Sequence, residues 1–401
     1  MQLANRVTGL GSEVAFEVLE EVESLTAAGR DIISLAIGEP DFTTPEPIKE
    51  AGIAAIKNDK TGYSPSAGIP ELREKIADYL RQSRQVDYSP AETVVAPGAK
   101  PLIFYGLLAL VEPGMEVIYP NPGFPIYESA IELLGGIPKA LPLRPEYDFT
   151  FNISELEKVI SSRTGGIIIN SPHNPTGSII SRNKMGQLAD LINDNDLWAI
   201  SDEVYSELVY EGRATSLSEF PKAKENTLLI DGFSKSYAMT GWRIGFAAGP
   251  RELIDVISKL ITNSVSCTAT FTQHAGVTAL TKGRESIKKM GTELKRRREL
   301  IWKGLNEIEG IHCRKPEGAF YAFADVTAAC RNLGLSNAAA LQQHLLQEAG
   351  VAVLHRECFG SKNPSEKKEF LRFSYASKYE LIQEALERIR RAVEVPNYKI
   401  S

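Results

Sequence analysis

The sequence predicts an α/β protein whose larger domain is a doubly wound, mostly parallel sheet and whose smaller domain is α+β. Over about the first 280 residues, short buried apolar runs that end in Gly, Pro, Asn or Asp alternate with helical segments, a pattern typical of parallel βαβ units. The 401 residues are enough for one large core and a second, smaller one. We therefore expect a large domain at residues 46–280 and a small domain formed by residues 1–45 together with 281–401.

Composition and charge argue against several classes of function. The net charge of −6 and the pI near 5.6 disfavour nucleic acid or an anionic membrane as the main partner. The longest apolar stretch near the middle, residues 102–111, is too short to cross a bilayer, and the N-terminus does not predict a signal peptide. The histidines form no H-x-x-x-H pair and the cysteines no C-x-x-C motif, so we expect no metal site, no disulfide framework and a cytoplasmic location.

The N-terminal segment alternates regular elements with turn-forming clusters. Residues 13–28 predict an amphipathic helix, and residues 31–37 a short apolar strand. The cluster GEPDF at 38–42 then indicates a loop before the next helix. Residues 61–77 predict a loop rich in Gly, Pro and Ser, followed by a helix that begins at Pro70.

Four buried strands in the middle of the chain each end in a cluster of turn-forming or acidic residues. We expect these strands at residues 93–96, 116–119, 164–171 and 197–201, with helices at 101–111 and from 126. The clusters that follow them are PGAK (97–100), NPGFP (121–125), PHNPTG (172–177) and DEVY (202–205). Open α/β sheets bind ligands at the carboxyl ends of their strands, so each cluster is a candidate for one site. The first has the strand, glycine turn and helix N-terminus of a phosphate cradle, although many βα units share that pattern.

Residues 228–246 (LLIDGFSKSYAMTGWRIGF) carry the strongest single indication of chemistry. A buried strand ends in a turn that holds Ser234 and Lys235, and Arg243 precedes a second apolar strand at 244–248. Most loop lysines are only solvated, but this one stands at the end of a buried strand, beside a hydroxyl and upstream of an arginine suited to phosphate. Lysine is also the residue that forms Schiff bases with carbonyl cofactors.

The last third of the chain predicts the smaller α+β domain. A Ser/Thr-rich stretch at 263–272 separates two helices, and the basic run KRRR at 295–298 in the second of them is typical of a solvated face. We expect strands at 318–323, 351–354 and 370–375, and a final helix from 379. Arg372 alternates with apolar residues on its strand, so it is either an edge residue or aimed into a polar pocket.

The motif at residues 234–245, S-K-x-x-x-x-x-G-x-R-x-G, resembles the lysine loop of fold-type I pyridoxal-phosphate aminotransferases of class I/II, the aspartate aminotransferase family. The other motifs, from Gly38 to Arg372, stand in that family's order. The resemblance implies the fold-type I architecture and an aminotransferase that uses pyridoxal 5′-phosphate. Such an enzyme moves an amino group from an L-amino acid to a 2-oxo acid by a ping-pong mechanism.

The resemblance also implies a role for each motif in holding the cofactor. Lys235 is expected to bind it covalently and to move the α-proton, while Asp202 pairs with the pyridine nitrogen and Tyr205 and Asn174 with the phenolic oxygen. Phe124 is expected to stack on the ring. The residues expected around the phosphate are Gly98, Ala99, Lys100, Ser234, Arg243 and, from the second subunit of a homodimer, Tyr63.

The same resemblance implies the remaining features of the site. The backbone of Gly38, together with Asn174 and Arg372, is expected to hold the substrate's α-carboxylate. The Asn174–Pro175 bond is expected to be cis. The stretch at 263–272 is expected at the subunit interface.

Substrate identity depends on fewer residues. Lys100 matches a lysine that reaches the distal carboxylate in dicarboxylate-using members. Against aspartate stand Phe124, where aspartate-specific members usually carry tryptophan, and Glu13, where they carry a small hydroxyl residue. We therefore expect aspartate or a broader set of amino acids, with 2-oxoglutarate, oxaloacetate or pyruvate as acceptor.

Two other functions fit parts of the sequence. His173, within Pro172-His173-Asn174-Pro175, also recurs in related carbon–sulfur β-lyases of the cystathionine type, which release pyruvate without any acceptor. A catalytically inactive protein that still binds pyridoxal phosphate is the third hypothesis. The sequence holds no G-x-x-x-x-G-K-[ST] phosphate loop and no G-x-S-x-G nucleophile motif.

Overall fold

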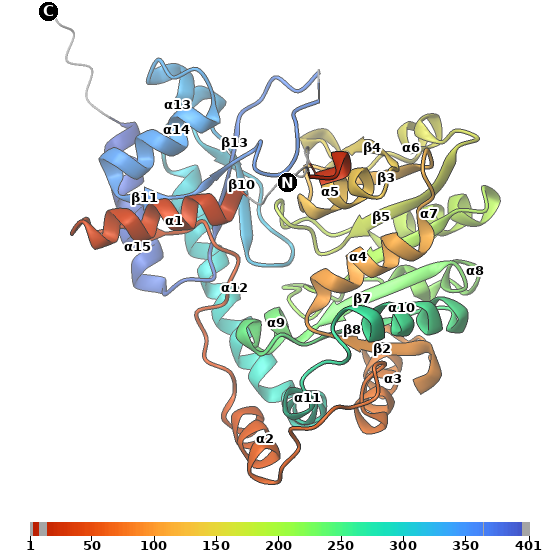
Figure 1. The fold of residues 1–401 in the computed structure, drawn as a ribbon. Coiled ribbons are helices and arrows are strands. Elements are labelled where there is room, and N and C mark those ends of the chain that lie inside the picture. The colour runs from red at the N-terminus through yellow and green to blue at the C-terminus, as the bar shows by residue number, and fades with distance from the viewer. Residues whose placement is uncertain (1–2, 8–13, 364, 395–401) are drawn as a thin grey trace, which may run out of the picture.

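A seven-stranded sheet forms the centre of the computed structural model, which describes residues 3–7, 14–363 and 365–394 (Figure 1). Its strand order is β2-β8-β7-β6-β5-β3-β4, and all neighbours run parallel except β8, which is antiparallel to β2 and β7. The strands are β2 (Thr93–Ala96), β3 (Glu116–Asn121), β4 (Ile137–Pro142), β5 (Thr164–Asn170), β6 (Trp198–Asp202), β7 (Thr227–Gly232) and β8 (Gly245–Ala248). The predicted mostly parallel sheet is confirmed.

Helices cover both faces of this sheet. Alternate strand residues point to opposite faces, so Leu228 and Ile230 pack in one core and Leu229 in another. The first face carries α4 (Ala99–Leu110), α5 (Ile126–Leu133) and α10 (Arg251–Ser264), and the second α3 (Pro70–Arg84), α6 (Ile153–Val159), α7 (Arg182–Asp194) and α11 (Thr270–Lys282). The sheet is therefore doubly wound. The other helices of this region are α2 (Glu46–Lys57) and the single turns α8 (Pro221–Lys224) and α9 (Phe233–Ser236).

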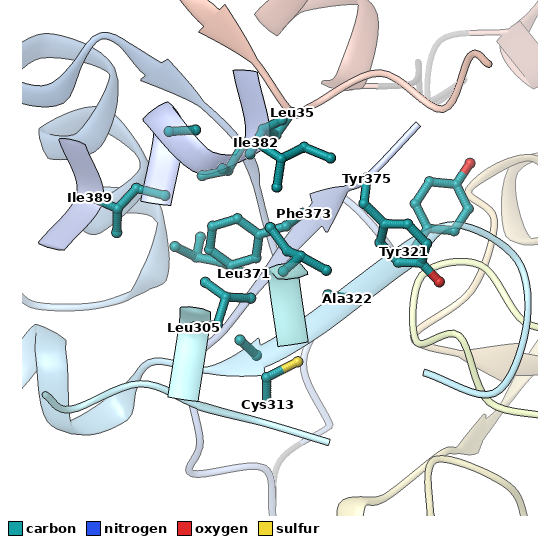
Figure 2. Packing of buried hydrophobic residues seen from close by; sticks show 14 of the residues in the cluster. Leu35, Leu305, Cys313, Tyr321, Ala322, Leu371, Phe373, Tyr375, Ile382 and Ile389 are labelled. Carbon is teal, nitrogen blue, oxygen red and sulfur yellow. The ribbon is translucent and has the colours of Figure 1, made fainter. Parts of the chain in front are cut away.

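A smaller antiparallel sheet, in the order β12-β13-β10-β9, occupies the C-terminal third. Its strands are β9 (His312–Cys313), β10 (Tyr321–Asp325), β12 (Leu354–His355) and β13 (Phe370–Ser374). The helices around it are α12 (Arg284–Asn306), α13 (Thr327–Asn332), α14 (Ala338–His344) and α15 (Tyr379–Val393). Figure 2 shows the core between sheet and helices, where Leu371 and Phe373 of β13 meet Leu305 of α12 and Ile382 of α15.

The N-terminal segment lies with the C-terminal third, and Figure 1 shows α1 (Val14–Ala27) on the same side of the molecule as the blue C-terminal elements. Val18 of α1 shares a core with Leu354 and Phe370, and β1 (Ile33–Ser34) pairs in parallel with β11 (Val351–Ala352). The predicted domain limits at 46 and 280 are compatible with this arrangement and stay a prediction. In the described part of the chain, no helix is both long and apolar enough to cross a membrane.

The prediction that residues 295–298 form a solvated face is wrong for two of the four residues. Arg297 and Arg298 are buried on α12. Arg297 forms ion pairs with Asp41 and Glu293, and the guanidinium of Arg298 lies over the ring of Tyr210. A buried guanidinium is tolerated where charge partners and aromatic faces replace water. Arg297 therefore joins α12 to the loop at 38–42.

Candidate active site

A cavity of about 590 Å³ opens at the carboxyl ends of the parallel strands and is lined by residues from both sheets. Eleven of the thirteen predicted site residues line it: Gly38, Ala99, Lys100, Phe124, Asn174, Asp202, Tyr205, Ser234, Lys235, Arg243 and Arg372. The structure thus brings together residues that stand more than 300 positions apart in the sequence. Gly98 lies directly behind the lining, and Tyr63 does not line the cavity.

Lys235 projects from the helical turn α9, which begins directly after β7. Its Nζ donates a hydrogen bond to the carbonyl oxygen of Gly38 at 2.7 Å. A Cβ added to Gly38 would lie 2.1 Å from the hydroxyl oxygen of Tyr321. A side chain at position 38 would therefore displace Tyr321 from the cavity wall.

Asp202 ends β6 and is buried. The hydroxyl of Tyr127 donates to its Oδ2 at 2.6 Å, and the backbone N–H of Val204 donates to Oδ1 at 3.4 Å. Burial raises the pKa of the Asp202 carboxyl to about 6, although both hydrogen bonds and the charge of Lys235 act in the opposite direction. A buried carboxylate of this kind is suited to a cationic partner inside the cavity.

Arg372 enters the cavity from β13, an inner strand of the small sheet, so the second of the two predicted positions is the one observed. Its Nη1 donates to Oδ1 of Asn174 at 2.8 Å, and its Nη2 donates to the carbonyl of Ala36. The guanidinium lies 4.4 Å from the ring centre of Tyr321 and 4.7 Å from that of Phe359. These contacts fix the plane of a guanidinium that can bind a carboxylate through two parallel hydrogen bonds.

Tyr205 stands beside this arginine. Its hydroxyl oxygen lies 2.8 Å from that of Tyr321, and burial raises the pKa of the Tyr205 phenol. The Asn174–Pro175 bond is cis, as predicted.

The glycine turn before α4 meets Arg243. Gly98 has φ of 101°, a left-handed conformation that favours glycine, and an added Cβ would lie 2.4 Å from Nη2 of Arg243. Nη1 of Arg243 donates to the carbonyl of Thr240 at 2.8 Å. An arginine beside the first turn of a helix provides positive charge and backbone N–H groups for an anion.

Lys100 marks another part of the wall. Its Nζ lies 5.2 Å from the ring centre of Phe124 and 5.7 Å from that of Phe16, distances that allow cation–π contact with both. Phe16 comes from α1 and lines the cavity, although its side chain is largely exposed. Glu13, the other predicted specificity residue, lies outside the described residues.

Besides Gly98, two residues singled out in the sequence, Tyr63 and His173, are not among those that line the cavity. The side chain of Tyr63 is 92% exposed. His173 is buried, and its Nδ1 lies 2.8 Å from Oγ1 of Thr176. Burial lowers the pKa of His173 to about 3, so the ring is neutral at physiological pH.

Sequence reasoning missed several side chains that line the site, among them four aromatic ones: Phe16, Tyr127, Tyr321 and Phe359. Tyr127 lies in the first turn of α5, three positions after Phe124, and the two rings pack edge to face with their centres 5.9 Å apart. Its nearness to Phe124 in the sequence is the signal that could have indicated it. Tyr321 and Phe359 reach the cavity only through the register of the small sheet and the loop after β12, for which the sequence carries no local signal.

The fold and the cavity define a fold-type I pyridoxal-phosphate enzyme. The family model for aminotransferase class I and II matches residues 30–389, and the chain belongs to that family. It is 39% identical to the probable aspartate/prephenate aminotransferase of Aquifex aeolicus over 98% of both chains. It is 38% identical to the aspartate aminotransferase of Pyrococcus abyssi over 94% of this chain and 95% of that one.

Solved structures give the same result. The aspartate aminotransferase of Thermus thermophilus with maleate superposes with a TM-score of 0.92 at 34% identity, covering 98% of this chain and 100% of that one. The aspartate aminotransferase of Rhizobium meliloti has the same TM-score and identity, with 98% and 99% covered. The chain is therefore an aminotransferase that depends on pyridoxal phosphate.

The residues present fit that cofactor. The glycine turn that a Cβ would fill, with Arg243 against it, suits the phosphate, and the buried Asp202 suits a protonated pyridine nitrogen. Lys235 supplies an amine in the same cavity. Within the described residues no group of three or more His, Cys, Asp or Glu side chains is placed to hold a metal ion.

Proposed function

We propose that this aminotransferase acts on a dicarboxylic amino acid, aspartate or glutamate, within a broader set of substrates. The observation that carries the proposal is that Lys100 and Arg372 line one cavity with Lys235. A guanidinium can hold an α-carboxylate, and an ammonium at another wall can attract a distal one. The relatives from Aquifex and Pyrococcus, named as aspartate or aspartate/prephenate aminotransferases, support the same substrate class.

Arg372 and Lys235 have different roles toward the substrate: the first binds its α-carboxylate and the second moves its α-proton. Arg372, held by Asn174 and two aromatic rings, orients the α-carboxylate so that the α-hydrogen faces Nζ of Lys235. Nζ, acting as the base, would take that proton from the α-carbon and deliver it to the carbon on the other side of the amino nitrogen, two atoms away. A bound pyridoxal phosphate supplies the electron sink that makes the α-proton acidic.

The remaining residues hold and tune the cofactor in this proposal. Asp202 keeps a proton at the pyridine nitrogen, and its hydrogen bond from Tyr127 fixes the carboxylate's orientation. Tyr205 and Asn174 donate to the phenolic oxygen, while Phe124 packs against the ring. Those proposed for the phosphate are Gly98, Ala99, Lys100, Ser234, Arg243 and the second subunit's Tyr63.

We also propose a homodimer and a cytoplasmic location. Two segments predicted at the subunit interface lie together, because the hydroxyl of Thr270 donates to the carbonyl of Gly62 at 2.6 Å beside the exposed Tyr63. An exposed tyrosine on a loop anchored in this way is suited to reach a second copy of the chain. The four free cysteines are compatible with a reducing compartment. Gel filtration with light scattering tests the dimer.

The Lys100→Met variant tests the substrate class. Methionine keeps the aliphatic stem and removes the charge, so KM for aspartate should rise about 10- to 100-fold, the usual worth of a hydrogen bond to a charged group. KM for alanine, which has no distal carboxylate, should stay within about twofold of wild type. An equal rise for both amino acids would show that Lys100 supports the site without reading the distal carboxylate.

A half-reaction titration separates the candidate activities. Single amino acids are added to the purified enzyme without any 2-oxo acid while the cofactor absorbance is followed. Conversion by aspartate or glutamate, with no pyruvate from cystathionine, supports the proposal. Sustained pyruvate release from cystathionine would favour the β-lyase, and no spectral change with any amino acid would favour an inactive protein. The lyase hypothesis gains no support from His173, which is not among the cavity-lining residues.

A further inference from the structure

Arg356 is a completely buried arginine just after β12, and every part of its guanidinium has a partner. Nε and Nη2 donate to the two carboxylate oxygens of Glu366 at 2.7 and 2.9 Å. Nη1 donates to the carbonyl of Gly360 at 2.8 Å, and Nη2 also donates to Oδ1 of Asn121 at 2.9 Å. Burying a charge is costly unless it is paired and hydrogen-bonded, so this set of contacts strongly restrains the side chain's position.

Asn121 brings the seven-stranded sheet into this network. It is the last residue of β3, and its Nδ2 donates to the carbonyl of Ser361 at 2.9 Å. Gly360 has φ of 104°, and an added Cβ would lie 2.9 Å from Oδ1 of Asn121. We call the set of Asn121, Arg356, Gly360 and Ser361 the Asn121–Arg356 clasp. It fastens the loop after β12 of the small sheet to the end of β3 in the large one.

The clasp encloses two residues that line the active-site cavity, Cys358 and Phe359. The carbonyl of Phe359 accepts a hydrogen bond from the backbone N–H of Gly123 at 3.0 Å, which adds a second attachment, to the loop that follows β3. The ring of Phe359 lies 4.7 Å from the guanidinium carbon of Arg372. Arg356 itself does not line the cavity, so it can act on the site only through the residues that it binds.

We propose that Arg356 is a positioning residue for substrate: through Asn121 it holds Phe359 against Arg372 and so orients the guanidinium that binds the substrate carboxylate. The inference rests on the proposed role of Arg372. A loop tied at Asn121 and Gly123 keeps its aromatic ring in place, whereas an untied loop lets the ring and the arginine turn together. A small misplacement of a binding group weakens productive substrate binding even when the fold is kept.

The Arg356→Met variant is compared with wild type by titration with maleate, an unreactive dicarboxylate, and by aspartate kinetics. We expect the Kd for maleate and the KM for aspartate to rise about tenfold, with kcat changed less than about threefold. The Kd for pyridoxal phosphate should stay unchanged, because none of the four clasp residues is among those that line the cavity. Arg298→Met is the matched control: Arg298 is also buried and paired, with Glu299, but lies outside the cavity lining. It should lower the Tm without changing the Kd for maleate.

Asn121→Ala is a second variant that serves if Arg356→Met folds poorly. It removes the hydrogen bond between Arg356 and Asn121 from the Asn121 side and leaves Arg356 paired with Glu366. If Arg356 acts through Asn121, the double variant should weaken maleate binding no more than the stronger single variant. A lower Tm with unchanged Kd and KM in both single variants would overturn the proposal, and so would fully additive effects. Failure of the wild-type enzyme to bind maleate would overturn only the proposal of a dicarboxylic substrate. The variants are then compared with wild type by the KM of whichever amino acid converts the cofactor.

Discussion

Replacing Lys235 with alanine is expected to reduce kcat/KM by about 10⁴-fold or more, the upper end of what one general base contributes. Nζ of Lys235 is the amine that we place against the substrate's α-hydrogen, and alanine provides neither a base nor a covalent attachment for the cofactor. The phosphate turn and Asp202 are untouched, so the variant should still bind pyridoxal phosphate reversibly. The measurements are steady-state kinetics and removal of the cofactor by dialysis.

Two comparisons make this prediction specific. A small primary amine in solution should restore part of the rate in Lys235→Ala, because it replaces the missing base in the cavity. Lys224→Ala is the control, since Lys224 lies on α8 and donates to the carbonyl of Asp87, with no part in the cavity lining. A Lys235→Ala enzyme with more than about one-tenth of wild-type activity would show that another group moves the proton.

The site residues carried by the large sheet could be predicted because their positions follow one physical rule. Asp202 is the last residue of the buried strand β6, and Lys235 follows the end of the buried strand β7 by three positions. Strands β6 and β7 are parallel neighbours, with Asp202 opposite Ile230. Carboxyl ends of parallel strands meet at one edge, so the two residues had to lie near each other. Strand β4 escaped prediction because its sequence, IPKALP, contains two prolines and is buried only in part.

The contribution of the small sheet could be predicted only in outline. Arg372 stood out as a charged residue among apolar neighbours. The two aromatic rings that pack against its guanidinium, those of Tyr321 and Phe359, are placed there by strand register and by the conformation of a loop. Arg356 gave no signal at all, because charged residues are rarely fully buried and its partner Asn121 is 235 positions away. Long-range pairing of polar side chains is set by the assembled fold and leaves no local pattern in the sequence.

Replacing Asp202 with asparagine is expected to have opposite effects on the enzyme without and with its cofactor. Without it, burial raises the pKa of Asp202 from 3.8 to about 6. The folded state therefore binds a proton more tightly than the unfolded state, and stability falls as pH rises from about 4 to 6. Above that window the buried charge costs about 3 kcal/mol, since each pKa unit corresponds to about 1.4 kcal/mol. The neutral amide avoids this cost and can still accept the hydrogen bond from Tyr127.

Asp202→Asn without cofactor should thus have a higher Tm than wild type at pH 8, and the difference should shrink towards pH 4. With pyridoxal phosphate bound, the order should reverse, because an amide cannot hold a positive charge at the pyridine nitrogen. Activity should fall about 10²- to 10³-fold, the usual effect of removing one preorganised electrostatic partner. Calorimetry from pH 4 to 8, with and without cofactor, measures both effects.

The difference in Tm between Asp202→Asn and wild type reports on Asp202 alone, because the two proteins are identical elsewhere. Burial also raises the pKa of Asp231, to about 7, but Asp231 is present in both proteins, so its contribution cancels in the difference between their Tm values. Asp194→Asn, at an exposed position on α7, should leave both Tm and activity unchanged. A lower Tm for Asp202→Asn without cofactor at pH 8 would mean that the carboxylate is compensated in the folded protein before any cofactor arrives. In that case Asp202 would already be ionised at no net cost before the cofactor binds, because neighbouring groups would offset the energy of burying its charge.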